Sequence, residues 1–151
     1  MTGVGYWLPV LILASVGCAG GPSMEAARAG LGRAAIVLLQ ADQQFKPAYV
    51  AARADARDTS PDWQERDAKL TYWEAAKIAL VALKAQLLAA ESVLDAQEAG
   101  QESDWLMVVA CAADAISTLR AAWKEIGQRA PPALSGAEAT LRAAGATCGG
   151  P

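Results

Sequence analysis

The chain has 151 residues, enough for one domain, and a formal net charge of −3 at pH 7, which argues against electrostatic capture of nucleic acid. It contains no histidine, and this excludes serine–histidine and cysteine–histidine catalysis, haem ligation through histidine and most zinc sites. Alanine, the best helix former, accounts for 36 residues, whereas β-branched residues are sparse, so the composition favours closely packed helices over a sheet.

The N-terminal segment carries no charged side chain before Glu25. Residues 8–13 form a short apolar centre, and mostly small residues follow at 14–21. A transmembrane helix needs about 20 strongly apolar residues, whereas a secretory signal has a shorter apolar core and a cleavage zone of small residues. The pattern predicts a signal peptide over residues 1–17. The alternative is an uncleaved anchor that crosses the membrane once.

The segment 14–18, ASVGC, resembles the lipobox of bacterial lipoproteins. In that family a diacylated cysteine becomes the mature N-terminus, and Gly17 and Cys18 match its two most demanding positions. The resemblance implies a lipid on Cys18 and a flexible tether over 18–23. Ala19 stands where an aspartate would favour inner-membrane retention in Gram-negative bacteria, so the resemblance implies the periplasmic face of the outer membrane. An ordinary signal peptide with an incidental cysteine is the remaining alternative.

Beyond the tether, apolar residues recur three and four positions apart, the spacing of a helix face buried against other helices. This spacing predicts helices at residues 24–57, 61–99, 103–129 and 136–144. Pro47 is expected to kink or split the first helix, because proline removes a backbone donor. Ser60 is expected to cap the second helix, and Ser135 the fourth, in a capping box with Glu138.

Short links between long amphipathic helices predict antiparallel neighbours. The fold expected for residues 24–151 is therefore all-α: an elongated antiparallel three-helix bundle with a short fourth helix packed back on the third.

The chain has three cysteines, Cys18, Cys111 and Cys148. If Cys18 carries lipid, the even remainder in an exported protein suggests a disulfide between Cys111 and Cys148. The third helix covers about 27 Å between residues 111 and 129. The short fourth helix and the irregular residues around it can span that distance back, so Cys148 can arrive opposite Cys111. The alternative is two buried free thiols.

Four acidic residues, Glu91, Asp95, Glu98 and Glu102, share one helical face in a stretch without lysine or arginine. We interpret them as a solvated face, and a cation or partner site and carboxylate catalysis are the alternatives. We expect no catalytic residue, no metal site and no cofactor.

The far end of the first two helices carries mixed charge and an aromatic side chain. Arg53, Arg57, Trp63 and Arg66 are the candidate partner surface at this end. The alternatives are a solubilising loop face and, for Trp63 and its neighbour Tyr72, a packing contact at the start of the second helix.

These features predict a non-enzymatic, lipid-anchored protein of the periplasm or envelope that acts as a binding or structural module. Its expected partners are the membrane, through the N-terminal lipid, and either another protein or a second copy of the chain, but no nucleic acid. A phage- or prophage-encoded envelope lipoprotein used in lysis or superinfection exclusion is the alternative function, and a carboxylate-dependent hydrolase is an alternative from another class.

Overall fold

The structure is a computed structural model that describes residues 23–128, 130–143 and 148. They form four helices: α1 (Met24–Thr59), α2 (Trp63–Glu98), α3 (Trp105–Glu125) and α4 (Pro132–Arg142). No strand occurs in this part of the chain. The predicted all-α class is confirmed, whereas the predicted signal peptide, the lipidated Cys18 and most of the tether lie outside the described residues.

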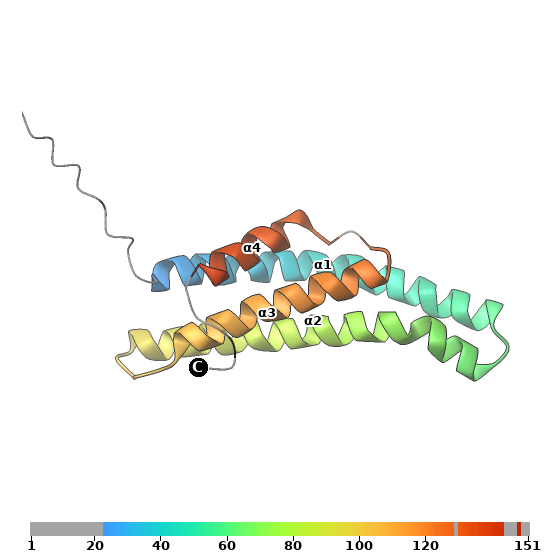
Figure 1. The fold of residues 1–151 in the computed structure, drawn as a ribbon, viewed down its shortest axis with the longest axis horizontal. Coiled ribbons are helices and arrows are strands. Elements are labelled where there is room, and N and C mark those ends of the chain that lie inside the picture. The colour runs from blue at the N-terminus through green and yellow to red at the C-terminus, as the bar shows by residue number, and fades with distance from the viewer. Residues whose placement is uncertain (1–22, 129, 144–147, 149–151) are drawn as a thin grey trace, which may run out of the picture.

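The helices form the predicted elongated bundle, in which α1, α2 and α3 run up, down and up (Figure 1). Helix α4 folds back along α3, as expected, and it also packs against α1. The short helix therefore covers the side of the bundle between α1 and α3 (Figure 1).

Small and medium apolar side chains build the core at the predicted three–four spacing. In α2 this spacing is followed by the buried residues Ala76, Leu80, Leu83, Leu87, Ala90 and Leu94, and Ala79 beside them is buried as well. Alanine at such positions lets helix axes approach closely. Helices α1 and α4 lie close together at Gly30, where a Cβ atom would lie 2.9 Å from Cδ2 of Leu141.

Two predicted helix caps, at Ser60 and Ser135, differ in the structure. Asp62, not Ser60, caps α2, and its carboxylate accepts from the backbone N–H of Gln64 at 3.3 Å. Ser60 instead ends α1 and is fully buried. The capping box at Ser135 is wrong, because α4 already begins at Pro132 and the Ser135 hydroxyl donates to the Pro132 carbonyl at 2.7 Å.

Helix α1 is uninterrupted through Pro47, so the expected split does not occur. Proline at this position leaves the carbonyl of Gln43 without its helical donor. Gln43 and Pro47 are both exposed, so water can satisfy that carbonyl.

An aromatic cluster closes the core where α3 ends. Phe45 lies 5.5 Å from Trp123 of α3 and 5.9 Å from Trp73 of α2, measured between ring centroids, and it stacks on Tyr49 at 5.4 Å. Beyond this cluster α1 and α2 continue alone as a two-helix hairpin (Figure 1). Between residues 46 and 75 only Ala56 and Ser60 are buried.

Among the described residues, α3 is the one helix that is long and apolar enough to cross a membrane by length and composition alone. A core helix meets the same criterion, and α3 buries seven residues between Val109 and Trp123, although only 33% of its most apolar 18-residue window is buried.

Candidate functional site

The hairpin formed by the end of α1 and the start of α2 contains a groove of about 560 Å³. All four predicted partner-surface residues line it: Arg53 and Arg57 from α1, and Trp63 and Arg66 from α2. Antiparallel packing brings these positions together, because the turn at residues 60–62 folds the two helix ends side by side. That they bind a partner stays a prediction.

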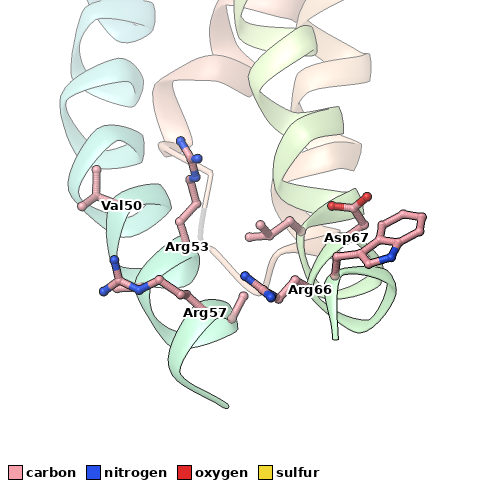
Figure 2. Close-up of a pocket in the computed structure, with 9 residues that line it drawn as sticks. Val50, Arg53, Arg57, Arg66 and Asp67 are labelled. Carbon is pink, nitrogen blue, oxygen red and sulfur yellow. The ribbon is translucent and has the colours of Figure 1, made fainter. Parts of the chain in front are cut away.

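The three arginines are held at different positions around the groove (Figure 2). Arg66 extends from α2 toward α1, and its guanidinium donates to the Pro61 carbonyl at 3.0 Å. Arg57 pairs with Asp58 at 3.1 Å. Arg53 lies over the ring of Tyr49, 5.8 Å from its centroid, and has no ion-pair partner among the described residues.

The charge of the groove lining is predominantly positive. Its charged residues are the three arginines and Asp67, and the remaining lining is apolar, with Val50 and Leu70 among it. A guanidinium offers planar, paired donors that match a carboxylate or a phosphate. The groove can therefore take up an anionic group beside an apolar one.

Trp63 adds a large aromatic surface at the rim. Trp63 is 64% exposed and Tyr72 is 55% exposed, so most of each residue faces solvent and is not covered by the packing contact considered from the sequence. Exposed tryptophan beside arginine is the combination enriched at the centres of protein interfaces.

The structure brings Cys111 and Cys148 together as a disulfide, with a Cα–Cα distance of 4.6 Å. Cys111 is half-buried in α3 and Cys148 is exposed. The bridge ties Cys148, which follows α4 in the chain, back to the second turn of α3, as the chain lengths predict.

The acidic face of α2 is partly used within the bundle, which the sequence analysis missed. Arg28 of α1 bonds Asp95 at 2.6 Å and Glu98 at 2.7 Å, and these hydrogen bonds, that of Glu98 first, raise the pKa of the guanidinium. Opposite charges level with each other in a hairpin would have been the signal for this pairing. Glu91 and Glu102 remain exposed.

A second cluster joins α3 and α4. Glu138 accepts from Arg120 at 2.7 Å and from Arg142 at 3.0 Å, while Arg142 also pairs with Asp114 at 2.8 Å. Partial burial raises the pKa of Glu138, but the hydrogen bonds from the two arginines outweigh it and leave the pKa below its ordinary value.

Within the described ranges, no group of three or more cysteine, aspartate or glutamate side chains is placed to hold a metal ion.

Comparisons of the chain with protein-family models, with curated proteins and with solved structures find no match.

Proposed function

We propose that this chain is a non-enzymatic, lipid-anchored envelope protein, and that its bundle is a binding module that presents the hairpin groove to a partner protein. The observation that carries the proposal is that Arg53, Arg57, Trp63 and Arg66, from two helices, all line one groove. The hairpin has little core to stabilise, so core packing does not account for this concentration of arginine and exposed tryptophan.

The groove and the anchored end lie far apart. Helix α1 has 36 residues, which span about 54 Å, and it begins at Met24, six residues after Cys18. The proposed lipid holds one end of the bundle at the membrane surface, whereas the groove is at the other end. The partner we propose offers carboxylates, because guanidinium groups line the groove.

The lipid is tested by intact mass of the full chain recovered from membranes of a Gram-negative host. The expected mass lacks residues 1–17 and includes acyl groups, and Cys18→Ala is expected to lose the acyl groups and the cleavage. Recovery of the full chain from Met1 without lipid would establish the uncleaved anchor instead.

The groove is tested by photo-cross-linking in cells. A photoreactive amino acid replaces Val50, which lines the groove, or Gln101, which is exposed at the opposite end of the bundle. We expect one protein adduct from position 50, none of that size from position 101, and at least a fivefold loss of the adduct with Arg53→Ala and Arg57→Ala combined. An adduct that forms equally well in the arginine variant contradicts the proposed site.

A further inference from the structure

The outer face of the α1–α2 pair carries large apolar side chains that the described residues leave uncovered. Ile36 and Leu39 of α1 are 61% and 64% exposed, and Ile78, Val81 and Leu88 of α2 are 67%, 64% and 58% exposed. A groove of about 420 Å³ runs between the two helices, with Leu39, Val81 and Leu88 in its lining. Large apolar side chains that gather along an exposed groove are a feature of interaction surfaces.

The exposed positions of α2 repeat at the spacing of a coiled coil. Ile78, Val81, Ala85 and Leu88 follow one another at intervals of three, four and three residues, and all four are exposed. They form a second seam, separate from the buried seam of the same helix. A further helix can pack on this second seam by inserting its side chains between those of α2.

One positive and one negative side chain flank the centre of this seam, and together they indicate which helix packs on it. Lys84 and Glu91 both line the groove, seven residues apart on α2, and neither has an ion-pair partner among the described residues. When α2 pairs antiparallel with its own copy so that Ala85 faces Leu88, Lys84 of each copy lies beside Glu91 of the other. A two-fold axis repeats every contact, so both charges of both copies are matched.

Helix α1 contributes to the same centre. The contacts of Tyr49 with Glu74 and of Arg28 with Asp95 set the register of the α1–α2 hairpin. This register places Ile36 and Leu39 of α1 level with the middle of the α2 seam. The apolar residues of both helices therefore gather around the point through which the two-fold axis would pass.

We propose that this face is the interface of an antiparallel homodimer, in which the occupant of the outer α2 seam is α2 of a second copy. The interface involves neither Cys18 nor the residues of the hairpin groove, so its test does not require the proposed function to hold. Antiparallel pairing places the N-terminal ends of the two copies at opposite ends of the dimer, so two lipid-anchored copies would lie along the membrane surface and not upright on it. The dimer leaves the two hairpin grooves free at its opposite ends.

Cysteine cross-linking of the full chain in membranes tests the register. The reagent is a bismaleimide that spans about one helix diameter, roughly 10 Å, and yields are measured against the unsubstituted chain. Leu88→Cys lies beside the axis and is expected to give a cross-linked dimer. Ile78→Cys, equally exposed on the same seam, would lie roughly 25 Å from its mate and is expected to give none. A dimer from Ile78→Cys, or a Leu88→Cys adduct with a different protein, overturns the proposal.

Charge reversal tests the identity of the occupant. In the Leu88→Cys background, Lys84→Glu or Glu91→Lys alone brings like charges together twice and is expected to lower the dimer yield at least fivefold. Combining both reversals in one chain, or mixing the two single variants, restores opposite charges at both contacts and is expected to restore the yield. A yield that is unaffected by the single reversals, or that is not rescued by the double reversal, refutes the antiparallel pairing.

Discussion

At the scale of single residues, buried polar groups show where the chain departs from apolar packing. Ser60 is fully buried at the end of α1, and its hydroxyl has no hydrogen-bond partner among the described residues. Ser103, at the α2–α3 turn, is half-buried, and two acceptors lie within reach of its hydroxyl hydrogen: the Val93 carbonyl at 3.2 Å and Oε1 of Gln97 at 2.9 Å. The Ser103 hydroxyl therefore replaces its lost hydrogen bonds to water with bonds inside the protein, whereas the Ser60 hydroxyl does not.

Replacing each serine by alanine is expected to change stability in opposite directions. Ser60→Ala removes an unsatisfied hydroxyl and should raise the free energy of unfolding by up to about 1 kcal/mol, whereas Ser103→Ala should lower it by about 1 kcal/mol. Urea denaturation followed by circular dichroism measures both. Equal destabilisation by the two substitutions would mean that the Ser60 hydroxyl has a partner in solution.

Glu138 predicts a pH dependence of stability. Because the pKa of Glu138 is lower in the folded than in the unfolded chain, its contribution to stability is fully present above the unfolded pKa and is lost as the pH falls through the folded pKa. At pH 7 Glu138→Gln should cost about 1 kcal/mol, a value reduced for the half-exposed arginine partners. Below the folded pKa this difference should vanish.

The control for Glu138 is Glu125→Gln at an exposed position of α3 without an ion pair among the described residues. We expect it to change the free energy of unfolding by less than about 0.5 kcal/mol at neutral pH. Denaturation curves at pH 7 and at low pH provide the comparison. A constant difference between Glu138→Gln and the parent chain across this range would exclude the carboxylate as its source.

At the scale of the helices, two glycines of α1 have different roles although they are two residues apart. Gly30 is buried against α4, where Leu141 and Thr140 leave no room for a methyl group, whereas Gly32 faces open space. The short helix α4 can approach α1 closely because Gly30 has no side chain. Gly32 has no such role and lowers the helix propensity of α1 without compensation.

Alanine substitutions separate these roles. Gly32→Ala is expected to raise the free energy of unfolding by about 0.5–1 kcal/mol, the gain in helix propensity. Gly30→Ala has the same gain but must displace the fully buried Leu141, and we expect a net loss of about 1 kcal/mol. Thermal unfolding of the two variants shows the difference directly. A stabilising Gly30→Ala would mean that α4 moves freely against α1.

Much of the helical arrangement could be predicted from the sequence, because three–four spacing marks the faces that are buried. Helix ends were less predictable: Ser60 has the features of a cap, yet the next capping residue, Asp62, takes that role. The groove residues were found as charges and an aromatic residue at one end of the chain's first two helices. Their convergence on one groove, and the pairing of Arg28 with the acidic face, depend on the register between helices, which the spacing of a single helix does not encode.

At the scale of the whole molecule, the disulfide between Cys111 and Cys148 closes a loop with a sequence separation of 37 residues that contains α4. Such a loop restricts the unfolded chain and stabilises the fold by about 3–4 kcal/mol. Because α4 covers the side of the bundle between α1 and α3, the bridge also limits how far that covering helix can move away.

Cys148→Ser is therefore expected to lower the free energy of unfolding by about 3–4 kcal/mol. Reductant should destabilise the parent chain to the same extent and leave the variant unchanged. Non-reducing electrophoresis should show a mobility shift for the parent chain that is absent in Cys148→Ser. No effect of reductant on the exported parent chain would show that the two thiols are free.

The two-helix hairpin beyond the aromatic cluster has an energetic consequence for the molecule. Between residues 46 and 75 only Ala56 and Ser60 are buried, so few core contacts hold the hairpin together. We therefore expect its backbone amides to exchange with deuterium through local unfolding of the hairpin, while the part of the bundle that contains α3 and α4 stays folded. We expect the chain to behave as two cooperative units of unequal stability along one pair of continuous helices. A ligand that binds the hairpin would slow hydrogen exchange of the hairpin amides, and the exchange rates of the α3–α4 part would serve as an internal reference.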